Sequence, residues 1–295
     1  MFTALIQSMR PRQWPKNAFV LAAVVFDRQL SLTDPLPLFR SLLGFTLFCF
    51  LSSAVYILND LSDIEADRQH PRKRLRPIAS GRLSEKAARG AAFGLLLITL
   101  PTAYLLSPYF FLVALAYFLL NMAYSRWLKH IVLVDVLLIA AFFVLRVGAG
   151  VTIIQVERFS PWLYVVTTLF ALYIGFGKRR AELTLLESDA QAHRRVLDGY
   201  SLPLLDQLIT IVSATTVLVY SLYTFSAPNL PTNHTMMLTI PFVLYGIFRY
   251  LFLIQIKHEG GAPEELLIMD RPLQITVLLW SVSILLIIYI LPRYF

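Results

Sequence analysis

The chain has 295 residues, of which 57% are hydrophobic and 15% charged, with a formal net charge of +8. Soluble domains have about 45–50% apolar and roughly 25% charged residues, so this composition indicates a chain that lies in lipid. It excludes a soluble α/β enzyme, a disordered chain and a fibrous repeat. The positive charge does not point to nucleic acid, because excess lysine and arginine in a membrane protein mark its cytoplasmic loops.

Nine predicted membrane-spanning helices follow from the apolar runs between polar breaks. A spanning helix needs about 20 mostly apolar residues, so nine spans leave too little chain for a large domain outside the membrane. The first span is the weakest, because it is short and is flanked by Pro15 and Asp27. We therefore expect a single all-α membrane domain over residues 1–295. In chain order, the spans cover residues 15–32, 37–58, 86–106, 108–126, 131–155, 160–177, 203–226, 235–256 and 273–292.

The lysine and arginine residues predict the orientation. With these spans, 20 of the 26 lie on one side, four on the other and two within spans. The N-terminus is therefore expected in the cytoplasm and the C-terminus outside the cytoplasmic membrane. The long charged connections 59–85, 178–202 and 257–272 all fall on the cytoplasmic side, which predicts an active site that opens to the cytoplasm.

The strongest local pattern is an acidic group at the end of the second span, formed by Asn59, Asp60, Asp63 and Asp67. In a helix the three aspartates share one face. Carboxylates crowded in this way repel one another unless a cation neutralises them, and oxygen ligands of this kind suit Mg²⁺. The alternative is a solvated helix end whose acidic residues face basic loops. We favour a magnesium–diphosphate site, because a basic stretch follows directly.

That basic stretch runs from His70 to Gly81 and ends in the sequence Arg-Pro-Ile-Ala-Ser-Gly. Lys73 and Arg76 are expected to bind phosphate oxygens, and arginine can do so through two parallel hydrogen bonds. The alternative is a positively charged loop in contact with anionic lipid, which explains some of these charges.

The aspartate motif, the Arg-Pro-Ile-Ala-Ser-Gly segment and the nine spans together resemble the UbiA superfamily of intramembrane prenyltransferases. The resemblance covers essentially the whole chain. Typical members carry a second motif, Asp-x-x-x-Asp, after the sixth helix, whereas residues 177–183 of this chain read Gly-Lys-Arg-Arg-Ala-Glu-Leu. Further segments are similar to a branch of the superfamily that transfers phosphoribose: residues 10–17, 124–129, 135–146 and 178–182.

The resemblance implies a glycosyl transfer in which 5-phosphoribose moves from phosphoribosyl diphosphate (PRPP) to a decaprenyl-type polyprenyl phosphate. The product would serve the synthesis of lipid-linked arabinose for cell-envelope glycans. Three phosphate centres meet in such a site, which explains why lysine and arginine replace the second aspartate motif. The alternative is a prenyltransferase that moves a polyprenyl group from its diphosphate to an aromatic or lipid-headgroup acceptor. A carrier for phosphorylated lipids is less consistent with the chain. Transporters often consist of two structurally related halves, and the two halves of this sequence show no such similarity.

The predicted site therefore combines a cation site with a set of phosphate ligands. Asp60, Asp63 and Asp67 are the predicted catalytic carboxylates and, with Asn59, the Mg²⁺ ligands. The predicted substrate-binding residues are Lys16, Asn59, Lys73, Arg76, Tyr124, Lys129, Arg146, Lys178 and Arg179. The expected partners are PRPP, polyprenyl phosphate and membrane lipid, and the sequence leaves a homo-oligomer open.

Arg146, Arg249 and the last cytoplasmic loop each allow two interpretations. Arg146 and Arg249 lie within spans, where a charge costs at least a few kcal/mol unless it faces a cavity or a partner. They therefore either line the site or form internal pairs, although Asp135 and Arg146 are too far apart along one helix to pair directly. Glu264 and Asp270 in the last cytoplasmic loop either bind ribose or a metal, or, for Asp270, cap a helix.

Overall fold

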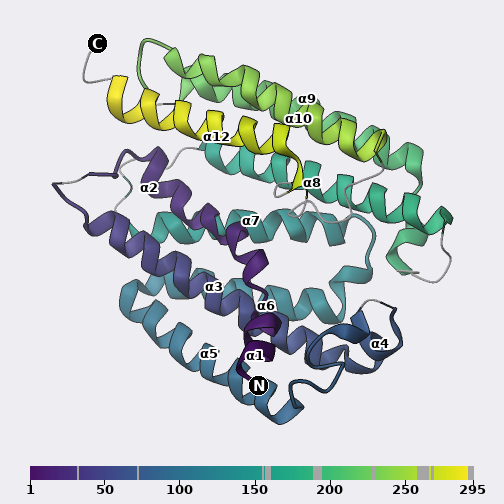
Figure 1. Cartoon of the computed structure of the whole chain (residues 1–295). Coiled ribbons are helices and arrows are strands. Elements are labelled where there is room, and N and C mark those ends of the chain that lie inside the picture. Colours follow the sequence, from purple (N-terminus) through teal and green to yellow (C-terminus); the bar gives the residue numbers. More distant parts are fainter. Residues whose placement is uncertain are drawn as a thin grey trace. The chain divides into compact units, whose positions relative to one another are not determined.

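The computed structural model describes residues 1–31, 33–71, 73–154, 156, 161–188, 195–227, 230–257, 266 and 269–291. All regular elements in these ranges are helices (Figure 1). The α-helices are α1 (Phe2–Met9), α2 (Ala22–Phe26), α3 (Leu36–Ser62), α4 (Ile64–Gln69), α5 (Glu85–Leu106), α6 (Pro108–Arg126), α7 (Val134–Ile153), α8 (Pro161–Ser188), α9 (Leu202–Ser226), α10 (Ile240–Gln255) and α12 (Arg271–Leu285). The shorter elements are η1 (Pro11–Leu21), η2 (Lys73–Leu75), η3 (Leu128–His130), η4 (Arg195–Gly199), η5 (Thr235–Thr239) and η6 (Leu286–Ile290).

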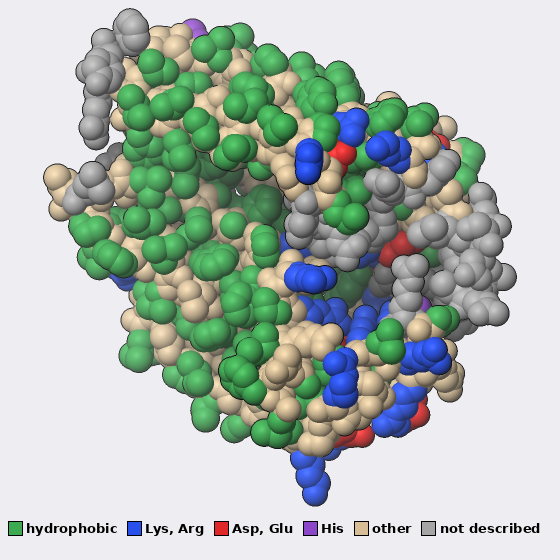
Figure 2. All heavy atoms as spheres, viewed as in Figure 1, with side chains coloured by type: hydrophobic (Ala, Val, Ile, Leu, Met, Phe, Trp, Pro, Cys, Tyr) green, Lys and Arg blue, Asp and Glu red, His purple; other side chains and the backbone are tan. Residues whose placement is uncertain are grey.

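Seven helices in these ranges are long and apolar enough to cross a membrane. They cover Leu36–Ser62, Glu85–Leu106, Pro108–Arg126, Val134–Ile153, Leu202–Ser226, Thr235–Gln255 and Arg271–Ile290. Each corresponds to a predicted span, whereas the predicted spans 15–32 and 160–177 are not among them. On the face shown in Figure 2, hydrophobic side chains cover much of the described surface, as expected where helices contact lipid tails. The chain is a multi-pass membrane protein.

The prediction of a continuous helix over residues 15–32 is wrong. The segment instead contains the end of the 3₁₀ helix Pro11–Leu21 and the short helix Ala22–Phe26. Pro15 has no backbone N–H, so it cannot donate an i→i−4 hydrogen bond. Arg28 has a left-handed backbone with a φ of 58°, which prevents continuation of the helix beyond α2.

The predicted boundary at residue 177 is also wrong, because α8 continues to Ser188. Lys178 and Arg179 therefore lie on a helix and not in a loop. Residues 178–188 contain no proline or glycine and are rich in arginine, leucine and glutamate, which favour helix. Helical spacing places Glu182 one turn after Arg179, and the two side chains form an ion pair.

The starts of four helices are fixed by side-chain caps. The hydroxyl oxygens of Ser84, Ser107 and Ser201 accept hydrogen bonds from backbone N–H groups three residues later, at the starts of α5, α6 and α9. Asp270 does the same for α12, where its Oδ1 accepts from the N–H of Leu273 at 2.9 Å. Such caps satisfy N–H groups that have no partner inside the helix.

The helices form two compact units. The first contains Met1–Val24, Gln29–Leu128 and Leu145–Val156, and the second contains Val25–Arg28, Lys129–Val144 and Glu157–Phe295. Helix α7 contributes its first half to the second unit and its second half to the first.

Helix α3 is the centre of the first unit, where it packs against α1, η1, α5 and α6. The ring of Phe48 on α3 lies 5.7 Å from that of Phe110 and 5.3 Å from that of Tyr117, both on α6. Helix α7 approaches η1 so closely that a Cβ on Gly150 would lie 2.1 Å from the carbonyl oxygen of Val20. Only glycine fits at this contact, which is how small residues bring membrane helices together.

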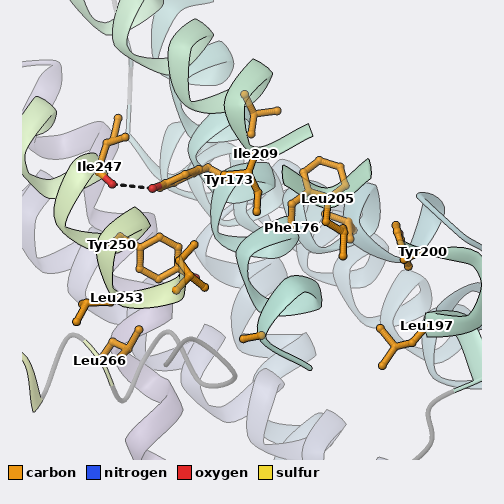
Figure 3. Packing of buried hydrophobic residues seen from close by; sticks show 14 of the residues in the cluster. Tyr173, Phe176, Leu197, Tyr200, Leu205, Ile209, Ile247, Tyr250, Leu253 and Leu266 are labelled. Atoms are coloured by element: carbon orange, nitrogen blue, oxygen red, sulfur yellow. Dashed lines mark hydrogen bonds between the residues drawn. The ribbon is translucent and has the colours of Figure 1, made fainter. Parts of the chain in front are cut away.

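The second unit is held by α8, which packs against α9 and α10, and by the pairing of α10 with α12. Its largest apolar cluster is shown in Figure 3 and includes Tyr173, Phe176, Leu205 and Tyr250. The hydroxyl of Tyr173 donates to the carbonyl oxygen of Ile247 at 2.7 Å, so a polar tip inside the cluster is satisfied. This packing fixes α8, which carries the basic residues that replace the second aspartate motif.

Candidate active site

The aspartate motif lies where α3 ends and α4 begins. Asp63 interrupts the helix with a φ of −101° and a ψ of 11°. The hydrogen-bond ladder nevertheless continues across the break, because the N–H of Asp63 donates to the carbonyl of Asn59 at 3.0 Å and that of Asp67 donates to the carbonyl of Asp63 at 2.8 Å. The approximate helical spacing is therefore kept. The prediction that the three aspartates share a face is confirmed for Asp60 and Asp67, since one arginine contacts both, and stays a prediction for Asp63.

That arginine is Arg76. Its Nη1 donates to Oδ1 of Asp60 at 3.1 Å and to Oδ2 of Asp67 at 2.6 Å. Asp60 is 3% exposed and Asp67 2% exposed, whereas the Arg76 side chain is 29% exposed. Two buried carboxylates require nearby positive charge, and Arg76 supplies it.

Arg10 provides a second positive charge at Asp60. Its Nη2 donates to the same Oδ1 that Arg76 contacts. The Arg10 guanidinium also lies 5.0 Å from the centre of the Tyr56 ring, a distance at which a cation is attracted to the aromatic face. The backbone of Arg10 is left-handed, with a φ of 53°, between α1 and η1. Ser53 of α3 anchors this junction, because its hydroxyl donates to the carbonyl of Met9 at 3.0 Å.

The segment that carries Arg76 is anchored on both sides of it. The N–H of Arg76 donates to the carbonyl of Lys73, and the carbonyl of Arg76 accepts from the N–H of Ser80, both at 2.9 Å. Ile78 and Leu83 are 2% exposed and pack in one apolar cluster with residues of α3 and α5. The segment is thereby fixed against α3, which directs Arg76 toward the aspartates.

The other residues of the two predicted motifs have different surroundings. The Oδ1 of Asn59 accepts a hydrogen bond from the hydroxyl of Ser125 on α6 at 2.7 Å, which places the residue after Tyr124 beside the motif. Asp63 is half-buried and Lys73 is exposed.

A second polar network lies inside the first unit around Arg146. Its Nε donates to Oδ1 of Asn17 and its Nη2 to the hydroxyl of Tyr117, both at 2.8 Å. The Nδ2 of Asn17 in turn donates to Ser52 on α3 at 3.2 Å. Arg146 is 4% exposed. It therefore ties α7 to η1 at the residue next to Lys16 and to α6 at Tyr117.

The second unit contains a buried charge cluster. Arg179, 0% exposed, donates from Nε to Oδ2 of Asp135 at 2.6 Å and from Nη1 to Glu182. The hydroxyl of Tyr200 donates to Oδ1 of Asp135 at 2.7 Å. Burial, reinforced by this hydrogen bond, raises the pKa of Tyr200, so the phenol stays protonated and keeps donating. The cluster joins the start of α7, the basic part of α8 and the segment before α9.

Two further arginines of the second unit pair with aspartates. Arg180 donates to Asp206 at 2.6 Å. Arg249 donates from Nε and Nη2 to the two carboxylate oxygens of Asp270, at 3.2 and 2.8 Å. These hydrogen bonds from Arg249 hold the pKa of Asp270 below its usual value. Asp270 therefore caps α12 and pairs with Arg249, while Glu264 lies outside the described residues.

The predicted site residues fall in both units. The first unit contains Lys16, Asn59, Asp60, Asp63, Asp67, Lys73, Arg76, Tyr124 and Arg146, and the second contains Lys129, Lys178 and Arg179. Arg10, Asp135 and Tyr200 are not among the predicted site residues. For Arg10 and Asp135 a signal was present, because each begins one of the segments that carry the family resemblance.

The carboxylate oxygens at the end of α3 are suitable ligands for a divalent cation. Asp60 and Asp67 converge on one nitrogen of Arg76, so their oxygens already surround a position of positive charge. Among the described residues, no group of three or more His, Cys, Asp or Glu side chains is arranged to hold a metal ion. Mg²⁺ commonly takes one or two carboxylates together with waters and substrate phosphates, so Asp60 and Asp67 are the residues whose positions fit it.

The fold and these clusters define a multi-pass helical membrane protein in which buried aspartates face arginines. The family described as the UbiA prenyltransferase family matches residues 18–269. The chain belongs to this family, and the resemblance seen in its motifs is confirmed.

Relatives and solved structures agree with this assignment. Decaprenyl-phosphate phosphoribosyltransferase of Corynebacterium glutamicum is 33% identical over 298 residues, which covers 98% of this chain and 88% of the relative. The protein of the same name from Mycobacterium tuberculosis is 32% identical and covers 96% of this chain and 94% of the relative. The structure of a UbiA homologue from Archaeoglobus fulgidus bound to GPP and Mg²⁺ has a TM-score of 0.72 at 21% identity, and covers 97% of this chain and 100% of that one. That likeness shows the fold.

Proposed function

We propose that the chain is a Mg²⁺-dependent polyprenyl-phosphate phosphoribosyltransferase. It transfers 5-phosphoribose from PRPP to a decaprenyl-type phosphate, releases diphosphate and yields a polyprenyl-phosphoryl-5-phosphoribose for lipid-linked arabinose. The observation that carries the proposal is the similarity, over nearly the whole chain, to relatives named decaprenyl-phosphate phosphoribosyltransferase.

The charges of the chain suit this substrate pair. PRPP and a lipid phosphate bring three phosphate centres, and a site for them needs more cations than a site for a prenyl diphosphate and a neutral aromatic acceptor. The part of α8 expected to carry a second aspartate motif instead carries Lys178, Arg179 and Arg180. Lys16, Lys73, Arg76, Lys129 and Lys178 are the proposed phosphate ligands. Arg179 has two carboxylate partners and complete burial, which favour a positioning role.

The reaction we propose is a single displacement at C1 of the ribose. An oxygen of the lipid phosphate forms the new bond to C1, and the bond from C1 to the diphosphate oxygen breaks with its electron pair on the diphosphate. The nucleophile is already anionic, so no strong general base is required, and catalysis is mainly positioning and electrostatic stabilisation. In-line attack inverts C1, from the α-diphosphate to a β-linked product.

The residues of this chain divide the remaining tasks. Asp60, Asp63 and Asp67, with Asn59, would hold Mg²⁺, which when bound supplies positive charge to the departing diphosphate. Arg76 stabilises the same diphosphate charge from the turn after α4. The hydroxyl of Tyr124 orients a substrate phosphate.

The topology that goes with this function keeps all nine predicted spans. We propose that 15–32 and 160–177 also cross the cytoplasmic membrane, as the broken segment η1–α2 and as part of α8. The units then belong to one domain over 1–295, consistent with a family match that runs through both. The N-terminus lies in the cytoplasm and the C-terminus outside, so the acidic and basic motifs face cytoplasmic PRPP. A reporter enzyme fused after residue 295 tests the topology. Reporter activity in the cytoplasm would contradict a C-terminus that lies outside the cytoplasmic membrane.

A direct comparison of donors tests the function. Purified protein in detergent with Mg²⁺ is offered PRPP with a polyprenyl phosphate, and separately a polyprenyl diphosphate with an aromatic acceptor. Consumption of PRPP only in the presence of the lipid phosphate, abolished by EDTA, supports the proposal. Consumption of the polyprenyl diphosphate instead would identify the chain as a prenyltransferase, the class of reaction for which the family is named.

A further inference from the structure

Arg76 contacts both buried carboxylates that are proposed to hold a metal ion. Its Nη1 lies within hydrogen-bond distance of one oxygen of Asp60 and one of Asp67. Mg²⁺ binds carboxylate oxygens at about 2.0–2.1 Å, closer than any N–H···O contact, and requires near-octahedral geometry. The guanidinium nitrogen and the ion therefore cannot both lie between these two carboxylates.

The two arginines at Asp60 differ in how firmly they are held. Arg10 contacts one carboxylate, lies over the ring of Tyr56 and belongs to a backbone junction anchored to α3 by Ser53. Arg76 bridges two carboxylates through a single nitrogen, while the two side chains are almost equally exposed, at 29% for Arg76 and 30% for Arg10. Its backbone is fixed by the turn, so a change in rotamer can move the guanidinium away from the aspartates while the segment stays in place.

We propose that Arg76 exchanges partners during substrate binding. Before the metal arrives, it holds Asp60 and Asp67 together as a substitute cation. With PRPP and Mg²⁺ bound, Arg76 would leave the carboxylates and pair with the diphosphate. The second half of this exchange rests on the function proposed above, whereas the first half depends only on the two aspartates and the cation.

The exchange makes Arg76 oppose binding of the metal alone and favour binding of the metal–PRPP complex. The metal alone must break two charge-assisted hydrogen bonds, but the complex provides phosphate oxygens that replace them. A ligand binds more weakly when its competent state is only a fraction of the population. Removal of Arg76 should therefore change the two affinities in opposite directions, which the loss of a merely structural residue would not do.

The test measures Mn²⁺ binding to the full chain in detergent by electron paramagnetic resonance, without substrate. Arg76→Gln should bind Mn²⁺ about tenfold more tightly than the wild type, which corresponds to about 1.4 kcal/mol. The same variant should bind PRPP in the presence of Mg²⁺ at least tenfold more weakly. Arg76→Lys keeps the competing charge and should retain nearly wild-type Mn²⁺ affinity. Arg89→Gln is the matched control, because Arg89 pairs with Glu85 on an exposed face of α5 and should change neither affinity.

A measurement on the wild type does not depend on whether variants fold. Arginine modification by phenylglyoxal, followed by mass spectrometry, should be several-fold faster at Arg76 with Mg²⁺ than without it, and slow again once PRPP is added. Arg10 should react equally in the absence and presence of Mg²⁺. The proposed exchange would be overturned by unchanged or weaker Mn²⁺ binding in Arg76→Gln. It would also be overturned if the rate of phenylglyoxal modification at Arg76 were the same with and without Mg²⁺. If Mn²⁺ binding shifts as expected but the wild type binds no PRPP, the proposed function fails and the competition between Arg76 and the metal stands.

Discussion

Replacement of Asp135 by asparagine should destabilise the protein far more than the same replacement at Asp206. Both aspartates accept a hydrogen bond from an arginine Nε on α8 at 2.6 Å. The Asp135 side chain is 0% exposed and its partner Arg179 is 1% exposed, whereas Asp206 is 38% exposed and Arg180 12%. The two pairs thus match in donor atom and distance and differ in burial, and the Arg179 pair also includes Glu182 and Tyr200.

Burial sets the expected magnitudes. Removing one member of a buried ion pair costs about 3–5 kcal/mol when the remaining charge is uncompensated, and the lower end applies here because Glu182 still faces Arg179. An exposed pair contributes only about 0–1 kcal/mol. Asparagine keeps the size of aspartate but loses the charge that faces Arg179, and its amide also disturbs the hydrogen bond from Tyr200. We therefore expect a loss of about 3 kcal/mol for Asp135→Asn and less than about 1 kcal/mol for Asp206→Asn.

Thermal unfolding in one detergent, with both variants and the wild type side by side, provides the assay. The midpoint should fall by several degrees for Asp135→Asn and remain close to wild type for Asp206→Asn. Equal shifts for the two variants, or a larger one for Asp206→Asn, would refute the argument that burial makes the Arg179 pair important.

Three more predictions concern other parts of the chain. Asp63→Asn should lower phosphoribosyl transfer at least about 100-fold, while the unfolding midpoint stays unchanged, because this half-buried carboxylate is a proposed metal ligand; near-normal turnover would remove it from the metal site. Gly150→Ala should lower the unfolding midpoint, at a cost of about 1–3 kcal/mol, whereas Gly148→Ala, with open space around it, should be tolerated; equal effects would contradict the close contact with η1. Asp270→Asn keeps a capping side chain but loses the ion pair with Arg249. The pKa of Asp270 is lowered in the folded state, so the pair stabilises the protein above about pH 4, the ordinary carboxylate range. The difference in stability between the variant and the wild type should therefore vanish as the pH falls below that range. A difference that persists at low pH would disprove this.

Most of the helices could be predicted from local pattern. The spans at 86–106 and 108–126 agree with α5 and α6 to within one residue, because Ser84 and Ser107 are strong cap residues and their apolar runs end in clear breaks. The segment 15–32 was misjudged because hydropathy does not register the missing N–H of Pro15. The end of α8 was misjudged because charge was taken to mark a loop.

The candidate site was predictable to the extent that its residues are close in sequence. Asp60 and Asp67 share a face because helical spacing requires it, and this was foreseen. The contact of Asp60 with Arg10 was not, because that residue is 50 positions from Asp60, and periodicity carries no information about pairing at such a distance. The same holds for Arg179 and Asp135, which are 44 positions apart. Long-range ion pairs depend on how helices pack, and only the structure defines them.

The most direct test of the proposed reaction uses PRPP labelled in two positions. Protein, Mg²⁺ and a polyprenyl phosphate are incubated with PRPP that carries ¹⁴C in the ribose and ³²P in the terminal phosphate of the diphosphate. Phosphoribosyl transfer moves ¹⁴C into the organic phase, leaves ³²P in the aqueous phase as diphosphate, and stops when EDTA is added. Arrival of ³²P in the lipid, or no transfer of either label to any polyprenyl phosphate, would contradict the account.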